Sequence, residues 1–566
     1  MSNLFIIEAP RKCKTLQELL EKIGVTAKVA ATKGHLYDMP GSLQVLGIDK
    51  GFRDFERKLI IPDIARYIRE LAAEAKHVYV ATDADQEGDV IAWDVAELIA
   101  DIHPDPYRVR LKGMDEDSIR AALDETTLVN KRDAVPGRTR AIVDRMIGSV
   151  FSQNGIAVGR VSTGLLGLVK DNPPCSLRIR LVAPAQDGGR PWVAETDVVT
   201  PLDGSIAARL AKVRFPALAV GATASKPYTR PPGNMGDIMV RAGDELNMSP
   251  AEASSSLQRL YEAGRMTYPR AGSRGISRSA LRKVHEVLKK SGYEFSADKV
   301  AEKKETDVHD APHPIGKVEI QLDPTKQGFD EGLRTLVARD LVRSGQSHAV
   351  QLGIGDVAGR HLATLGFSNA VCDFVAKLHW RREVGQRYPG QEAWPKSTVI
   401  ERRQDTVLLE LAKDYGLGRP STWAGEVTVD GVRKPTGIID KFLARKLVDQ
   451  NFQLTEKGRK WVAASPPLLL DPRISAYIED ACEKSLSGMM DHPEREPWEI
   501  LAERIVSVLP PEIQQPLFGA IDPVARHPKE DPTAPFRQTT TVDDIMRATR
   551  EKTYDYAPAM PSLTDY

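Results

Sequence analysis

Tyr268 and Arg270 are the side chains of this sequence best suited to attack a phosphodiester. A phenol oxygen can form a covalent bond to phosphorus, and a nearby guanidinium can stabilise the charge on the phosphoryl oxygens. One proline separates the two residues, so they would lie on the same face of an extended backbone. A single tyrosine is more often a core or stacking residue, and only the rest of the chain can decide between these readings.

The tyrosine follows a predicted helix whose start and end both have sequence signals. Ser249 and Glu252 have the spacing of a capping box at the start. The helix is predicted to run through Leu260 and to end at Gly264, because glycine adopts the left-handed conformation found at helix ends. A short extended segment, residues 266–268, then carries the tyrosine.

Three carboxylates are clustered directly after a predicted buried strand at residues 77–82. If the strand direction continues, Asp83, Asp85 and Glu87 lie on one face, and a divalent cation would relieve the repulsion between them. A solvated acidic loop is one alternative. A calcium-binding EF-hand loop is another, although such a loop joins two helices and this one follows a strand. We therefore expect a magnesium site that serves phosphate chemistry.

Strands and helices alternate through the first part of the sequence, which predicts a parallel α/β sheet. Ligands of such sheets bind beyond the carboxyl ends of the strands. Glu8, His35 and Asp83 each follow a predicted strand, so we expect them to meet at one edge of the sheet. The predicted strands are residues 4–7, 28–32, 77–82 and 108–111.

The composition is typical of a multidomain globular protein. Its 566 residues are too many for one hydrophobic core, so we expect about three or four domains or subdomains. The formal net charge is zero, and nucleic-acid binding would therefore depend on local basic patches. The four cysteines form no Cys-x-x-Cys pair, which argues against zinc ribbons and a disulfide framework. We recognise neither a signal peptide nor a membrane-spanning run, so we expect a cytoplasmic protein without a membrane partner.

Several motifs, in the same order along the chain, resemble those of the type IA DNA topoisomerases, most closely the bacterial topoisomerase I branch. The N-terminal motifs resemble the Toprim domain of this family, and no single motif is as specific as the ordered set. The motifs are Glu8-Ala-Pro-Arg-Lys12, Gly34-His35, Asp83-x-Asp85-x-Glu87-Gly88, Arg140-Ala-Ile-Val-Asp144, Gly159-Arg160-Val161-Ser162, Tyr268-Pro-Arg270 with Ser273, His309-Asp-Ala-Pro-His-Pro314 and Gly418-Arg-Pro-Ser-Thr422.

The resemblance implies a role for each of these residues. Tyr268 would attack a phosphodiester and keep the 5′-phosphate, while Arg270 and Lys12 would hold that phosphate. Glu8 would act as general acid toward the leaving 3′-oxygen. Mg²⁺, needed for rejoining, would be bound by Glu8, Asp83, Asp85 and Glu87. The residues implied in DNA binding are His35, Arg140, Asp144, Arg160, Ser273, His309, Arg419, Ser421 and Thr422.

Three positions depart from the family pattern. Gln86 stands where the family usually has arginine, Ala271-Gly272 replaces the usual Thr-Asp, and His313 replaces an arginine. Each change removes a charge or a charge-orienting group near the phosphate site. We expect these changes to affect the rate more than the class of reaction.

The resemblance further implies a toroidal core assembled from α/β, helical and β-rich domains. Residues 506–566 are rich in proline and polar residues, so we expect a poorly ordered C-terminal tail, with one short helix near residues 542–548. The other expected domains are 1–135 (Toprim), 136–172 with 386–505 (helical and DNA-binding), 173–229 with 346–385 (β-rich arch) and 230–345 (active-site tyrosine).

The function implied by the resemblance is ATP-independent relaxation of negatively supercoiled DNA by transient cleavage of one strand. The absence of a Walker A motif agrees with ATP independence. The enzyme would act as a monomer on single-stranded regions of the duplex, associated with the nucleoid. Two alternatives are another Toprim enzyme, such as a primase or a nuclease, and a catalytically weak relative that binds single-stranded DNA.

Overall fold

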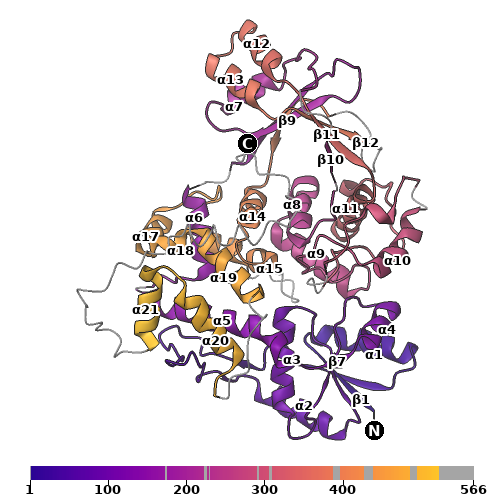
Figure 1. Ribbon diagram of the computed structural model, residues 1–566, viewed down its shortest axis with the longest axis vertical. Helices are drawn as coiled ribbons and strands as arrows, with labels where there is room; N and C mark the ends of the chain where they lie inside the picture. Colours follow the sequence, from indigo (N-terminus) through magenta and orange to yellow (C-terminus); the bar gives the residue numbers. More distant parts are fainter. Residues whose placement is uncertain are drawn as a thin grey trace.

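Two β-sheets lie at opposite ends of the molecule, with helices between them (Figure 1). One group of helices comprises α8 (Met235–Leu246), α9 (Pro250–Glu262), α10 (Arg278–Lys289) and α11 (Phe329–Ser344). A second group, on the other side, includes α6 (Arg160–Asp171), α17 (Glu456–Ala464) and α18 (Pro467–Leu470). The structure is a computed structural model that describes residues 2–153, 155–171, 175–221, 226–228, 230–289, 292–304, 309–385, 395–425, 437–484 and 494–521.

The N-terminal sheet has the strand order β2-β1-β5-β6-β7, and all of its pairings are parallel except β6 with β7. Phe5 packs with helices α1 and α4 on one face, and Ile6 packs with α2 and α3 on the other. The sequence prediction of a parallel α/β sheet is confirmed. The elements are β1 (Asn3–Ile7), α1 (Cys13–Lys22), β2 (Ala27–Ala31), α2 (Pro62–Glu74), β5 (Val78–Val80), α3 (Gln86–Leu98), β6 (Tyr107–Arg108), α4 (Glu116–Asp124) and β7 (Thr127–Leu128).

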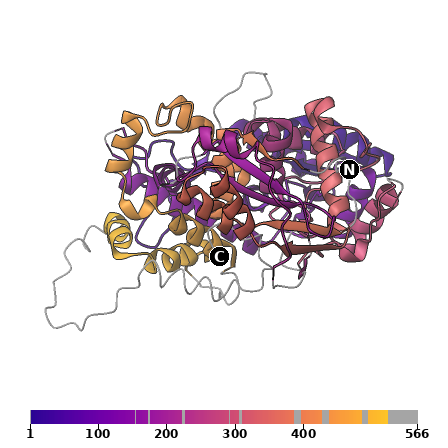
Figure 2. The ribbon, with the colours of Figure 1, turned by 90° about the horizontal axis from the view of Figure 1, so that it is seen from above.

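The second sheet has six antiparallel strands in the order β10-β11-β12-β9-β8-β13. Its strands come from segments far apart in the sequence, and the view from above shows them crossing the middle of the molecule (Figure 2). The strands are β8 (Leu177–Ala183), β9 (Trp192–Asp197), β10 (Lys226–Tyr228), β11 (His348–Leu352), β12 (Arg381–Gly385) and β13 (Thr398–Glu401).

The segment that leads from β11 to β12 is helical, whereas its sequence was expected to be β-rich. It forms α12 (Asp356–Thr364) and α13 (Asn369–Lys377), which pack on the sheet together with α7 (Gly204–Leu210). Ala358 and Leu362 are spaced by four residues and are fully buried, so the apolar spacing favours a helix over the predicted strand.

The first part of the expected disordered tail is also helical, and the prediction is wrong for residues 506–521. After α20 (Pro497–Ser507), the chain forms α21 (Pro511–Ile521), and Ile513 and Leu517 enter a core shared with α5 (Lys131–Phe151). Ile513, Leu517 and Ile521 recur every four residues, and burial of this stripe outweighs the proline inside the helix. The helix expected near residues 542–548 lies outside the described residues.

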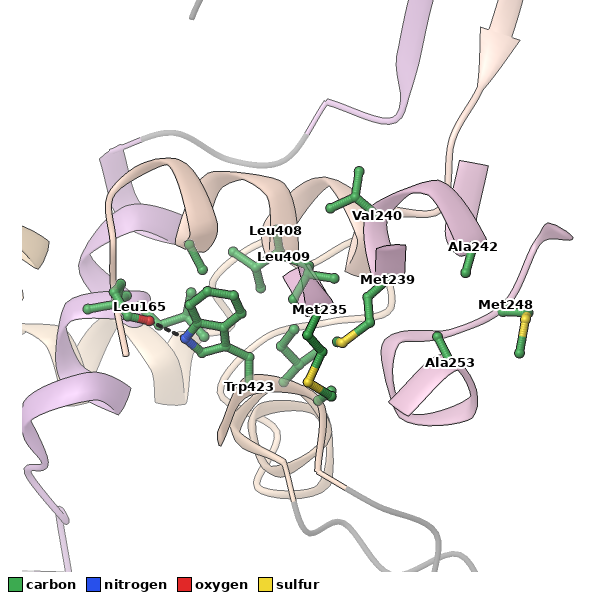
Figure 3. Packing of buried hydrophobic residues seen from close by; sticks show 14 of the residues in the cluster. Leu165, Met235, Met239, Val240, Ala242, Met248, Ala253, Leu408, Leu409 and Trp423 are labelled. Carbon is green, nitrogen blue, oxygen red and sulfur yellow. Dashed lines mark hydrogen bonds between the residues drawn. The ribbon is translucent and has the colours of Figure 1, made fainter. Parts of the chain in front are cut away.

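Another hydrophobic core joins the helices next to Arg160 and Arg419. Trp423, in α15 (Pro420–Ala424), packs against Leu165 of α6, Met235 of α8 and Leu408 of α14 (Gln404–Asp414), and its indole N–H donates to Leu417 O (Figure 3). This packing fixes the position of Arg419, the residue before α15. Among the described helices, none is long and apolar enough to cross a membrane.

Candidate active site

Residues 83–88, which we call the acidic turn, lie where the chain passes from the N-terminal sheet into α3. Asp83 still pairs with Leu111 across the sheet, but Asp85 is already the N-cap of α3 and accepts a 2.8 Å hydrogen bond from Gly88 N. The prediction that Asp83, Asp85 and Glu87 share one face of a strand is therefore wrong. Gly88 is required by this turn, because a Cβ there would lie 1.9 Å from Asp83 O.

Arg108 supports the acidic turn from inside the sheet, and sequence reasoning did not find it. Its guanidinium is 1% exposed and donates to Thr82 O at 2.9 Å, to Asp83 O at 2.9 Å and to the Asp89 carboxylate at 2.9 Å. A buried arginine inside a sheet next to acidic residues has no distinctive sequence signal. Its contacts fix the backbone on which the acidic side chains are placed.

Tyr268 lies against this turn. The predicted capping box of Ser249 and Glu252 is present, Gly264 ends the helix region with φ 67°, and Tyr268 N donates to Lys112 O at 2.9 Å. The Tyr268 phenol, only 1% exposed, donates a 2.5 Å hydrogen bond to Asp85 Oδ2. Burial, followed by the charges of the nearby aspartates, raises the pKa of Tyr268 well above its ordinary value.

Two cations and one carboxyl group complete the surroundings of the phenol. Lys12 Nζ lies 2.7 Å from Asp83 Oδ1, and Arg270 Nη1 lies 3.9 Å from Asp85 Oδ2. The pKa of Glu8 is raised to about 7, first by burial and then by the charges of Asp83 and Asp85. Glu8 therefore holds a proton in part of the population at neutral pH. The structure thus brings five predicted residues together around Tyr268: Glu8, Lys12, Asp83, Asp85 and Arg270.

Glu87 faces a different set of cations. Its carboxylate lies 3.1 Å from His35 Nε2, 2.7 Å from Arg419 Nη2 and 3.4 Å from Arg140 Nη1. Burial acts to raise the pKa of Glu87, but the His35 hydrogen bond and the Arg419 charge outweigh it, so the pKa lies well below its ordinary value. Glu87 is therefore ionised and holds three predicted DNA-binding residues together.

Glu479, in α19 (Pro472–Lys484), is a second carboxylate that contacts several arginines, and it was not predicted from the sequence. Glu479 is 8% exposed. Its carboxylate lies 3.0 Å from both Arg140 and Arg160, and 3.6 Å from Arg419. Arg160 also contacts Asp144 at 2.6 Å. The only available signal was the amphipathic pattern of α19, which does not single out one glutamate.

The substituted glutamine participates in the same network. Gln86, where the family usually has arginine, accepts a hydrogen bond from Arg140 and donates to Glu483 Oε1 at 3.3 Å. It thus connects the first turn of α3 to both α5 and α19, and Arg140 retains a partner on α3.

Among the remaining predicted DNA-binding residues, His309 lies against Tyr268. The His309 ring packs on the Tyr268 ring at 4.7 Å, its Nε2 contacts Ala84 O, and burial lowers its pKa to about 4. The Ser273 hydroxyl is used locally, donating to Gly275 O at 3.2 Å. Ser421 and Thr422 lie in the short helix that follows Arg419, half-buried and exposed respectively.

The donor chemistry of the acidic turn fits a hard divalent cation. Carboxylate oxygens are the ligands that Mg²⁺ prefers, and Asp83 and Asp85 are close enough to Glu8 to raise its pKa to about 7. Lys12 and Arg270 neutralise the two aspartates in the present arrangement. Within the described ranges, no three His, Cys, Asp or Glu side chains are grouped as metal ligands. The metal-ligand set thus stays a prediction.

Comparisons with known proteins agree with this geometry. A family model described as Toprim domain matches residues 3–113, and one described as DNA topoisomerase matches residues 205–351. DNA topoisomerase 1 of Campylobacter jejuni is 24% identical over 550 residues, covering 87% of this chain and 77% of the relative. The corresponding Helicobacter pylori protein is 24% identical over 551 residues, covering 87% and 73%.

A solved structure supports the fold. Full-length topoisomerase I from Thermotoga maritima matches with a TM-score of 0.55 and 17% sequence identity, covering 89% of each chain. This likeness is one of overall fold. It confirms the multidomain fold class expected from the sequence.

Proposed function

Because the chain belongs to the type IA DNA topoisomerases, we propose that it relaxes negatively supercoiled DNA by transient cleavage of one strand. The reaction needs no ATP, since the covalent link to the enzyme conserves the energy of the bond that it replaces. The substrate is a single-stranded region of the duplex, and the enzyme acts as a monomer in the cytoplasm, associated with the nucleoid.

The observation that supports this proposal most directly is the position of Tyr268. Its phenol is buried, donates to Asp85 Oδ2 at 2.5 Å and lies beside Arg270, in a site that also contains Lys12 and Glu8. The topoisomerase family model includes this residue, which argues against a primase or a nuclease. We assign Tyr268 as the nucleophile that forms a 5′-phosphotyrosine link.

The neighbouring residues support each step of the cleavage. Arg270 and Lys12 supply positive charge to the scissile phosphate, which stabilises the pentavalent transition state. In the resting arrangement Asp85 accepts a hydrogen bond from the phenol, which keeps the hydroxyl oriented, and it can take the phenolic proton when the oxygen attacks phosphorus. Glu8, with its pKa raised to about 7, carries a proton that it can give to the leaving 3′-oxygen. The network of Glu87 and Glu479 holds the arginines that bind the strand.

Mg²⁺ would be held by Glu8, Asp83, Asp85 and Glu87. When bound, it would supply positive charge that aligns the broken ends for rejoining. Binding would require Glu87 to give up its contacts with His35, Arg419 and Arg140. It would also require Lys12 and Arg270 to give up their contacts with the two aspartates. Both cations would then be available to the phosphate.

The substitution Tyr268→Phe tests the assignment. The ring would keep its packing against Tyr261 and His309, so the fold and DNA binding should persist, while the covalent adduct should disappear. The measurement is incubation with end-labelled single-stranded DNA, followed by denaturation and detection of protein-bound label. An adduct at the wild-type level in the variant would show that another residue is the nucleophile. No adduct in the wild type would favour a weak DNA-binding relative.

A further inference from the structure

A cationic surface lies on the helical region, and none of its residues belongs to the motifs described above. It is formed by α16 (Ile438–Ala444), the turn that follows, and α17. We call it the α16–α17 surface. Its cations, all exposed, are Lys441, Arg445, Lys446, Lys457, Arg459 and Lys460.

Two hydrogen bonds bring the two halves of this surface together. Lys457 Nζ donates to Arg445 O at 2.9 Å, and Thr455 Oγ1 donates to Lys446 O at 2.7 Å. The start of α17 therefore lies directly against the turn after α16. Cations that are separated by more than ten residues in the sequence are neighbours on one surface.

The surface keeps a positive charge because few of its cations are neutralised. Residues 438–465 contain six cations and three carboxylates. Glu456 pairs with Lys460 at 2.8 Å, whereas Asp449 accepts hydrogen bonds from the backbone N–H groups of Asn451 and Gln453. In a chain whose formal net charge is zero, this is a local excess of positive charge.

The opposite side of the same segment is firmly packed. Phe442, Phe452 and Trp461 are buried in the core that also contains Trp423. The Trp461 indole N–H donates to Ala157 O at 3.1 Å, and a Cβ on Gly437 would lie 2.3 Å from the backbone of Ala424. The surface is thus rigidly connected to α15 and to the segment that precedes Arg160.

We propose that the α16–α17 surface binds the phosphate backbone of double-helical DNA that flanks the single-stranded cleavage region. Surfaces that bind single strands combine cations with exposed aromatic side chains on which bases stack. All three aromatic residues of 438–465 face inward instead, so the surface offers charge to phosphates and no platform for bases. This inference rests on the proposed function, because it takes DNA as the substrate.

The test replaces the three cations whose side chains are exposed around the turn, in the variant Lys441→Gln/Arg445→Gln/Lys446→Gln. Binding to a DNA duplex of about 30 base pairs is measured between about 50 and 200 mM salt, and each lost phosphate contact should lower the slope of log affinity against log salt by about 0.9. We expect a decrease of about 2 to 3 in this slope. Affinity for a single strand of the same length and covalent adduct formation should be unchanged.

The matched control removes the same charge from the N-terminal domain, in the variant Lys22→Gln/Lys76→Gln/Arg120→Gln, whose three side chains are also exposed. The control should keep the wild-type slope for duplex DNA. Equal slopes for the two triple variants would overturn the proposal. An equal loss of single-strand and duplex affinity would also overturn it, in favour of a single-strand site. Adduct formation by the wild-type protein reports on the proposed function separately.

Discussion

The carboxyl groups around Tyr268 differ in their neighbours, and the neighbours determine which of them is charged. Glu8 is buried near two aspartates, and its pKa is raised to about 7. Burial also opposes ionisation of Asp85, but Arg270 and the Tyr268 hydroxyl outweigh it, and the pKa of Asp85 is lowered. The pKa of Glu87 is lowered as well, by its hydrogen bond with His35 and by the charge of Arg419. Glu8 is therefore the group among these three that can donate a proton near neutral pH.

Arg108→Lys should loosen the acidic turn while keeping the charge. A lysine cannot reach Thr82 O, Asp83 O and Asp89 together, and each buried acceptor left without a partner costs about 1 to 3 kcal/mol. We expect a destabilisation of at least about 2 kcal/mol and a higher Mg²⁺ concentration for half-maximal relaxation. Chemical denaturation and a Mg²⁺ titration measure these effects. Arg66→Lys, on the exposed side of α2, is the control and should change neither the stability nor the Mg²⁺ requirement.

His309 should make the protein less stable in mild acid. Burial lowers its pKa to about 4 in the folded state, whereas an unfolded histidine titrates near 6.5. As the pH falls from 6.5 toward 4, the unfolded chain binds the proton first, so stability is lost across this window. The loss at pH 5 amounts to about 2 kcal/mol.

The measurement for this prediction is the decrease in melting temperature between pH 7 and pH 5. It should be larger for the wild type than for His309→Gln, which has no imidazole to titrate. An equal decrease in both proteins would show that His309 is not held neutral by burial.

At the level of elements, α21 contributes to the folded core although its sequence contains Pro516. Leu517 is fully buried beside α5 and α20. Leu517→Ala should cost about 2 to 5 kcal/mol, as for other large-to-small changes in a core. Thermal or chemical denaturation measures the change, and Gln515→Ala on the exposed side of the same helix is the control. Equal stability of the two variants would mean that α21 is not docked in solution.

The elements that could be predicted from the sequence are those with a strong local signal. Continuous apolar residues predict β1, and the pair Ser249 and Glu252 predicts the start of α9. The turn into α3 at Asp85 was missed, because an N-cap aspartate after a strand also fits a continuing strand. For α12, residues 346–385 were expected to be part of a β-rich arch, whereas the four-residue spacing of Ala358 and Leu362 indicates a helix.

The candidate site could be predicted only where a motif marks it. Tyr268, Glu8 and Lys12 were found in this way, and they do lie together. Arg108 and Glu479 act through contacts with residues that are distant in the sequence. Arg108 donates to Asp83 O across 25 residues, and Glu479 accepts from Arg140 across 339 residues. Local spacing carries no record of such pairings, so a single sequence cannot reveal them.

For the whole molecule, equal numbers of cations and carboxylates predict weak retention on DNA. The chain has 78 of each, so its affinity for DNA depends on a few local phosphate contacts. Each contact contributes about 0.7 to 0.9 to the slope of log affinity against log salt concentration. We expect distributive relaxation that is fastest at low ionic strength. A time course with excess plasmid should show a ladder of intermediates. Fully relaxed plasmid beside untouched substrate, at physiological salt, would contradict this.

The order of strands in the six-stranded sheet has a consequence for synthesis of the chain. β9 pairs with β8 on one edge, but on the other edge Val193 pairs with Arg381 of β12. At translation rates of about 5 to 20 residues per second, the nascent chain waits on the order of 10 to 40 seconds before β12 emerges. During that interval β9 has an open hydrogen-bonding edge, and the apolar side chains beneath it lack the cover of α12 and α13. The two-stranded hairpin of β8 and β9 is therefore exposed to wrong pairing on the ribosome.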